Sequence, residues 1–343
     1  MPDAAKLQIE KIITEVLATI DREREREIIS RRFGLFDRKE TLEQIGELLG
    51  ITRERVRQLE KAVVARLKSQ ADSGQLPHID MVQDALLEQL GSLGNIARIS
   101  DLTAKLTTDN TRVDQARISF LAQLSPKLVV IDDNDHYYHA VGISGAHDEK
   151  TIKKMVEKII AAVKQIGEPA PIEDVSKAAK VDSTKHAAAL ASISKALATL
   201  NNRWGLIRWP MVNPKNIRDK IYVILKENGK HMHFNEIAAA IKKSEFKRKD
   251  VTTQAIHNEL IKDKRFVLIG RGIYALKEWG YEKGTVADII TEVLKKSKQP
   301  LHRDEIVKLV LKSRYVKETT ILLNLQGKPQ FKRVAKATYA LAE

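Results

Sequence analysis

Apolar residues recur at helical spacing along most of this chain. Over residues 4–19 and 41–49, Leu, Ile and Val return every three or four positions, with charged residues between them, and we expect residues 22–32 to form the helix on which 4–19 packs. That spacing is typical of amphipathic α-helices that bury one face. Shorter β-branched and aromatic runs around a turn, such as FVLIGRGIYAL, occur later in the chain and predict hairpins. We therefore expect a mainly α-helical protein with small β-hairpins.

The stretch 41–61, TLEQIGELLGITRERVRQLEK, combines helical spacing with turn chemistry. Gly50 stands where a left-handed helix cap favours glycine, and Thr52 is a suitable N-cap for a second helix. The stretch therefore predicts a helix-turn-helix. The apolar positions of its first helix are Leu42, Ile45, Leu48 and Leu49.

The predicted second helix has two distinct faces. Val56, Leu59 and Val63 share one face at about 100° per residue. Arg and Gln can read guanine and adenine edges in the major groove, and Glu can accept from the cytosine amino group. The opposite face would be such a reading surface, or alternatively a solvated surface held by ion pairs. It consists of Arg53, Glu54, Arg57, Gln58 and Lys61.

Residues 17–67 resemble region 4 of the primary bacterial sigma factors, through the segments RRFGL and TRERVRQLE, and the similarity extends over about 5–68. The resemblance implies that the second helix enters the major groove of a promoter minus-35 element. It implies base contacts from Arg53, Glu54, Arg57 and Gln58. It also implies phosphate contacts, which set register without reading sequence, from Arg32, Thr41, Thr52, Arg55 and Lys61.

We expect the domain at 1–70 not to open a promoter by itself. Sigma factors carry their promoter-melting and core-binding regions upstream of region 4, whereas here a single short helix precedes the region-4-like part. Ser69–Pro77, SQADSGQLP, is polar and rich in breakers, which predicts a linker.

Four later segments share one plan, which we call the first to fourth repeats. Each has two helices joined by a turn, a third helical stretch, and two β-like runs around a turn, as in a winged helix. Their bounds are 79–142, 150–210, 216–280 and 285–343.

The third repeat resembles the HARE-HTH winged-helix domain, which also occurs in the delta subunit of bacterial RNA polymerase. The segments that carry this resemblance are IRDKIYVILKENGKHMHFNEIAAAIKK and RFVLIGRGIYALKEWGY. The fourth repeat resembles it through PLHRDEIVKLVL and FKRVAKATYALAE, and the first two by plan alone. The resemblance implies binding to nucleic acid or to polymerase.

The repeats offer weaker candidate contacts. A basic run and a wing-tip arginine in the third repeat could meet phosphate, or could be a solubilising surface: Lys242, Lys243, Lys247, Arg248, Lys249 and Arg271. We expect core or interface positions for the tryptophans Trp204, Trp209 and Trp279. The first wing is acidic at Asp132, Asp133 and Asp135, so we expect that repeat to face protein.

The charge balance favours a polyanionic partner. The formal net charge is +14, with 59 Lys and Arg against 45 Asp and Glu. Because the basic residues are interleaved with acidic ones, nucleic acid fits better than a membrane surface. The absence of cysteine excludes disulfides and thiolate zinc sites. Without a signal-like or spanning apolar run, we expect a cytoplasmic, nucleoid-associated protein.

The sequence does not indicate an enzyme, a cofactor, a metal site or a small-molecule substrate. His231 and His233, and His136 and His139, lie near each other without further ligands at metal-site spacing. We interpret the chain as a DNA-binding transcription regulator that could also contact RNA polymerase. Alternatives are a polymerase-docking protein that reads no sequence, and the DNA-targeting subunit of a defence system.

Overall fold

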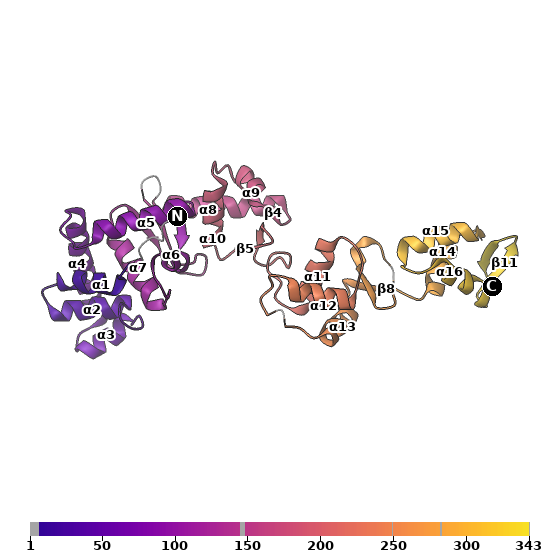
Figure 1. Cartoon of the computed structure of the whole chain (residues 1–343), viewed down its shortest axis with the longest axis horizontal. Coiled ribbons are helices and arrows are strands. Elements are labelled where there is room, and N and C mark those ends of the chain that lie inside the picture. Colours follow the sequence, from indigo (N-terminus) through magenta and orange to yellow (C-terminus); the bar gives the residue numbers. More distant parts are fainter. Residues whose placement is uncertain (1–6, 145–147, 249, 282, 343) are drawn as a thin grey trace. The chain divides into compact units, whose positions relative to one another are not determined.

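The computed structural model describes residues 7–144, 148–248, 250–281 and 283–342. The chain divides into two compact units, Met1–Arg208 and Trp209–Glu343, and each is considered by itself (Figure 1). Within these ranges helices dominate, and the strands form four small antiparallel sheets. The expectation of a mainly α-helical protein is confirmed.

From residue 7 onward, the first unit opens with four helices, which we call the head: α1 (Ile9–Ala18), α2 (Glu23–Phe33), α3 (Leu42–Leu49) and α4 (Arg53–Asp72). Most of their apolar positions are buried as the spacing predicted, with Ile13, Ile28 and Val56 fully inaccessible to solvent. Leu48 of α3 departs from the prediction, because its side chain is 54% exposed. Gly34 ends α2 in the left-handed region at φ 68°. A side chain there would meet the Lys39 main-chain nitrogen at 2.8 Å, so the loop after α2 closes tightly only over glycine.

The predicted helix-turn-helix is confirmed in its local chemistry. The Thr41 hydroxyl accepts a hydrogen bond from the Gln44 N–H at 3.3 Å, and the Gln44 side chain accepts from the Thr41 N–H at 2.9 Å. Gly50 caps α3 at φ 63°, and the Thr52 hydroxyl caps α4 by accepting from the Arg55 N–H at 3.2 Å. The two threonine caps satisfy main-chain donors, and the Gly50 cap satisfies main-chain carbonyls, that the helices themselves leave free.

The interpretation of Ser69–Pro77 as a linker is wrong for its first half. Helix α4 continues to Asp72, and Ala71 and Leu76 are 4% and 3% exposed. Both belong to one hydrophobic core that runs from Ile9 in α1 to Val141 in the first repeat. The head and the first repeat are therefore packed on a shared core.

The first and second repeats complete the first unit. Each contains a helix, a short strand, two further helices and a two-stranded hairpin. The first has α5 (Ile79–Leu93), β1 (Ile96–Arg98), α6 (Ile99–Leu106), α7 (Arg112–Leu124), β2 (Leu128–Ile131) and β3 (Ala140–Ile143). The second has α8 (Glu149–Ile166), β4 (Ala170–Pro171), α9 (Ile172–Ala179), α10 (Thr184–Ile193), β5 (Leu197–Leu200) and β6 (Arg203–Leu206).

The second unit has the same order twice. The third repeat has α11 (Ile217–Asn228), β7 (Met232–His233), α12 (Phe234–Lys243), α13 (Thr253–Lys262), β8 (Phe266–Gly270), β9 (Ile273–Leu276) and the 3-10 helix η1 (Lys277–Trp279). The fourth has α14 (Val286–Ser297), β10 (Leu301–His302), α15 (Arg303–Ser313), α16 (Glu318–Gly327), β11 (Phe331–Ala335) and β12 (Thr338–Leu341).

In all four sheets the last strand lies in the middle, between the short strand and the first hairpin strand. The short strand was not predicted, because its two or three residues are too few to show an alternating pattern. It pairs with the central strand, for example Met232 with Tyr274, and so anchors each hairpin to the helices.

Candidate nucleic-acid interface

The four predicted base-reading side chains lie together on the first two turns of α4. Arg53, Glu54, Arg57 and Gln58 are all exposed, while Val56 between them is fully buried. The buried face fixes the rotation of the helix, because Val56 packs with Ile28 of α2 and Ile45 of α3. Consequently the polar face of α4 is turned to solvent.

Ion pairs hold this polar face in the free protein. Arg57 donates to Glu54 at 2.6 and 2.9 Å, and Arg53 pairs with Glu43 of α3 at 2.9 Å. The hydrogen bond from Arg57 lowers the pKa of Glu54, so this carboxyl is charged at neutral pH. Exposed ion pairs are weak because water and salt screen them, so both arginines can exchange these partners for a ligand.

Of the residues predicted to contact phosphate, four are exposed to solvent and one is engaged in contacts within the head. Arg55 and Lys61 are exposed, and Thr41 and Thr52 are exposed N-caps whose hydroxyl hydrogens remain able to donate. Arg32 is instead engaged within the head: its Nε donates to Glu60 of α4 at 3.1 Å, and its Nη1 to the Glu40 carbonyl at 3.3 Å.

The candidate basic residues that the structure describes in the third repeat are exposed, and they lie at two places. Lys242 and Lys243 end α12, Lys247 and Arg248 follow in the loop, and Arg271 lies on the turn between β8 and β9. The predicted Lys249 lies outside the described residues.

This loop is anchored by the buried side chain of Lys220 from α11, which is 5% exposed. Its ammonium donates to the carbonyls of Lys247 and Arg248 at 2.8 and 2.7 Å. Burial lowers the pKa of Lys220, and the charge of Arg248 lowers it further. Lys220 escaped sequence analysis because nothing in the helical pattern distinguishes a buried lysine from a surface one.

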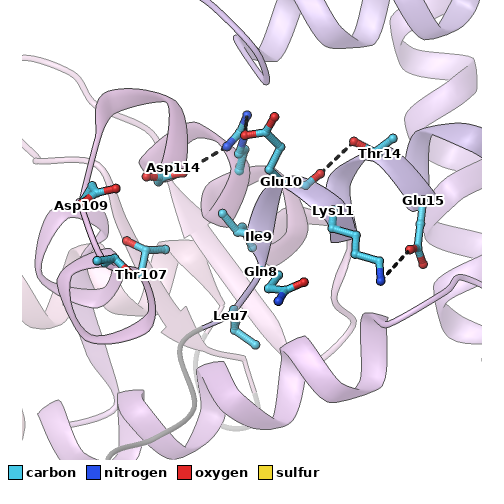
Figure 2. Close-up of a pocket in the computed structure, with 12 residues that line it drawn as sticks. Leu7, Gln8, Ile9, Glu10, Lys11, Thr14, Glu15, Thr107, Asp109 and Asp114 are labelled. Carbon is cyan, nitrogen blue, oxygen red and sulfur yellow. Dashed lines mark hydrogen bonds and ion pairs between the residues drawn. The ribbon is translucent and has the colours of Figure 1, made fainter.

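In the first repeat, the third helix packs against the head. Helix α7 contacts α1, α2 and α4, and the ring of Phe120 lies 4.7 Å from that of Phe33. Arg117 is 7% exposed and donates to the Leu35 carbonyl at 2.7 Å, Asp114 at 3.2 Å and Glu10 at 3.0 Å. Arg117, Asp114 and Glu10 line a hollow between α1 and the first repeat, where Arg117 pairs with both carboxylates (Figure 2).

The second repeat packs against the small sheet of the first. Helix α10 packs on β1, and the Arg98 Nε donates to the Ser192 carbonyl at 2.5 Å. The acidic turn meets a cation, because Asp133 pairs with Lys195 at 3.0 Å. The first repeat thus packs against other parts of this chain, and its binding to another protein stays a prediction. The third helices of these two repeats are therefore occupied by internal contacts.

The histidines do not assemble a metal site in the described part of the chain. His139 lies beside Ser119, with its Nε2 2.8 Å from the hydroxyl oxygen, and the main chain at His136 accepts from Lys195. Over the described ranges, no three His, Asp or Glu side chains are grouped as metal ligands. Within the same ranges, no helix is both long and apolar enough to cross a bilayer.

The head is similar in sequence to a domain of known proteins. Residues 22–69 match the family model "Sigma-70, region 4". The sigma factor RpoD of Helicobacter pylori is 42% identical over 71 residues, which cover 20% of this chain and 10% of that protein. SigA of a Bacillus species is 41% identical over 76 residues, covering 22% of this chain and 20% of SigA. The chain thus spans a tenth to a fifth of the length of these relatives. The resemblance of the helix-turn-helix head to region 4 of RNA polymerase sigma factors is confirmed.

Proposed function

We propose that this protein is a DNA-binding transcription regulator or auxiliary factor that reads a promoter minus-35-like element in duplex DNA through its head. One observation carries the proposal: in a head similar to sigma region 4, the exposed face at the start of α4 presents Arg53, Glu54, Arg57 and Gln58 together. A helix of this width fits the major groove, where base edges differ between all four base pairs.

In this proposal α4 enters the groove with its N-terminal turns. Arg57 would offer two donors to a guanine edge, Gln58 would pair with adenine, and Glu54 would accept from a cytosine amino group. On binding, Arg57 would leave Glu54 or share it, as the exposed position of the pair permits. Arg55, Lys61, Thr41 and Thr52 would contact phosphates on either side. Arg32 is the weakest member of that set, because Glu60 already engages its Nε.

We further propose that the repeats 79–142, 150–210, 216–280 and 285–343 are winged-helix modules, and that the last two are HARE-HTH-like. Support comes from the shared element order and from the four sheets in which the last strand is central. Since α7 and α10 are covered by internal contacts, the first two modules would serve as a rigid support for the head.

The protein would act in the cytoplasm by occupying a promoter-like site. Bound there, it would either block access to the minus-35 element or link that element to RNA polymerase. Polymerase contact is included because the curated relatives are RNA polymerase sigma factors. The head offers donors and acceptors for bases and phosphates, and the proposal needs no catalytic step, cofactor or metal.

The test is fluorescence anisotropy of the full chain on a minus-35-like duplex and on a shuffled duplex of equal composition, across a salt series. Base reading should leave an affinity gap between the duplexes at every salt concentration, whereas phosphate contacts weaken with salt on both. Superimposable curves would contradict base reading. Salt-stable, nuclease-resistant binding to purified polymerase core would then favour docking without sequence reading.

A further inference from the structure

The hairpins of the third and fourth repeats have the same register, but the first strand carries charge only in the fourth repeat. In the third, Phe266 pairs with Leu276, Leu268 with Tyr274 and Gly270 with Ile273. In the fourth, the equivalent pairs are Phe331 with Leu341, Arg333 with Tyr339 and Ala335 with Thr338. Both contain an irregularity at the same place, between Leu268 and Gly270 and between Arg333 and Ala335. The two hairpins can therefore be compared position by position.

In the third repeat the outer face of the hairpin is apolar and covered. Val267, Ile269 and Ala275 are inaccessible to solvent and pack against Trp279 and Tyr281, which follow the hairpin in sequence. This second, small core explains why the strand FVLIG is apolar on both faces. It also accounts for Trp279 as a structural side chain rather than a base-stacking platform.

In the fourth repeat the equivalent face is exposed, and β11 carries charge where β8 is apolar. Lys332 stands at the position of the buried Val267 and Arg333 at that of Leu268, which is 47% exposed, while Lys336 retains the charge of Arg271. Val334, the equivalent of Ile269, is 49% exposed where Ile269 is 0% exposed. Lys328, just before the strand, is exposed as well. We call Lys328, Lys332, Arg333 and Lys336 the basic wing; it is formed by β11 and its flanking turns (Figure 1).

The charge of the basic wing is uniform, in contrast to the rest of the chain. Residues 328–342 contain these four basic residues and no acidic one, whereas the whole chain has 45 acidic residues to its 59 basic ones. Solubility alone is served by interspersed charges of both signs. An exposed hairpin with one sign of charge suits a polyanion whose charges are regularly spaced.

We propose that the basic wing binds the phosphate backbone of duplex nucleic acid, independently of sequence. Its long side chains can each meet a phosphate. The β11–β12 hairpin carries Lys332, Arg333 and Lys336, and Lys328 lies just before it, at the end of α16. Duplex nucleic acid fits better than an anionic bilayer, because Val334 is the one exposed large apolar side chain on the wing and an interfacial anchor needs a broad apolar face. The proposal does not depend on base reading by the head.

The test compares two variants of the full chain that lose the same charge. The wing variant is Lys332→Gln, Arg333→Gln and Lys336→Gln. The control is Lys295→Gln, Lys308→Gln and Lys312→Gln, at exposed helix positions of the same repeat. Circular dichroism melts establish that both remain folded, and the single variant Lys336→Gln, at the turn, provides a milder substitution. Affinity for a random-sequence duplex of about 40 base pairs is measured by anisotropy from low to moderate salt.

We expect the wing variant to bind the random duplex roughly tenfold more weakly than wild type, and the slope of log affinity against log salt to shrink by up to about 3. The control should change little in either quantity, and Lys336→Gln should reduce the slope by about 1. The affinity ratio between minus-35-like and shuffled duplexes should survive in the wing variant. If the wild-type chain binds minus-35-like and shuffled duplexes equally well, the head does not read bases. If the wing variant still loses affinity for the random duplex in that case, the proposal for the basic wing holds.

Equal losses in the wing variant and the control would show an effect of net charge alone and overturn the proposal. Co-sedimentation with phosphatidylglycerol vesicles gives the other decisive outcome. If the wing substitutions abolish vesicle binding and leave duplex binding unchanged, the partner of the wing is an anionic lipid surface, and the nucleic-acid proposal is wrong.

Discussion

The Nε of Arg117 donates a 2.7 Å hydrogen bond to the main-chain carbonyl of Leu35, 82 residues earlier in the chain. Leu35 belongs to the loop that leads from α2 into the helix-turn-helix, and Arg117 lies on α7 of the first repeat. The same guanidinium meets Glu10 of α1. One buried cation thus ties the first repeat to α1 and to the loop after α2. This contact fixes the loop that leads into the helix-turn-helix.

Replacing Arg117 with Met should destabilise the first unit by about 3 kcal/mol, because the Leu35 carbonyl and the buried Asp114 carboxylate would lose a charged donor. Hydrogen exchange of peptides from α2 and α7 in the full chain measures the effect locally. Arg112→Met, at an exposed position of the same helix, is the control and should stay within about 0.5 kcal/mol of wild type. Equal protection in both variants would show that Arg117 does not hold the head.

Gly94→Ala should loosen the contact between the first and second repeats. Gly94 has φ 97°, and an added Cβ would lie 2.6 Å from the Lys185 carbonyl oxygen of α10. Strain and collision together should cost at least about 2 kcal/mol. Gly91→Ala, three residues earlier in α5 with open space around it, should instead gain up to about 1 kcal/mol, since alanine favours helix. Urea unfolding of the two variants should therefore move in opposite directions; a shared direction would contradict the packing described.

Arg57→Ala and Arg55→Ala should separate base contact from phosphate contact. We expect Arg57→Ala to cost about 1 to 3 kcal/mol on the minus-35-like duplex and little on a shuffled one. Arg55→Ala should weaken both duplexes alike and lower the salt slope by about 1. Paired anisotropy titrations provide the measurement. A uniform loss from Arg57→Ala would assign that side chain to phosphate.

Local chemistry made the helix-turn-helix predictable. Thr41, Gly50 and Thr52 each act on main-chain groups within four residues, so their positions in the sequence define the caps. The apolar spacing likewise identified which face of α4 packs inward. The exposure of Arg53, Glu54, Arg57 and Gln58 follows from that face, whereas the pairing of Arg53 with Glu43 depends on how α3 meets α4.

Long-range packing was not predictable in the same way. Ser69–Pro77 has the composition of a linker, yet Leu76 inserts into the shared core, which a local reading of polar and breaker residues cannot show. Arg117 and Lys220 look like ordinary surface cations, because burial of a charge depends on carbonyls that come from distant segments. The basic wing was missed because its significance appears only when β11 is aligned with β8 through their shared register.

Acid should destabilise the first repeat through His139. Burial lowers the pKa of this imidazole, against the weaker opposing effect of Asp132. The unfolded chain therefore binds a proton more readily than the folded one, so stability is complete above the ordinary histidine pKa of about 6.5 and falls as pH drops below it. The slope is at most about 1.4 kcal/mol per pH unit. Unfolding titrations at pH 7 and pH 5 should show a smaller drop for His139→Gln than for wild type; equal drops would exclude His139 as the source.

Lys220→Met should displace the basic loop of the third repeat, Lys247 and Arg248, without removing the charge of either residue. The buried ammonium holds the carbonyls of Lys247 and Arg248, and its loss should cost about 1 to 3 kcal/mol because both carbonyls lose a charged donor. If the basic loop contacts phosphate, random-duplex affinity should fall too, although Lys220 itself barely reaches solvent. Lys230→Met removes the same charge from an exposed turn and should leave stability nearly unchanged. If the two variants lose duplex affinity equally, charge alone explains the effect; a larger loss in Lys220→Met means that the geometry of the loop matters, because a displaced cation meets its phosphate less well.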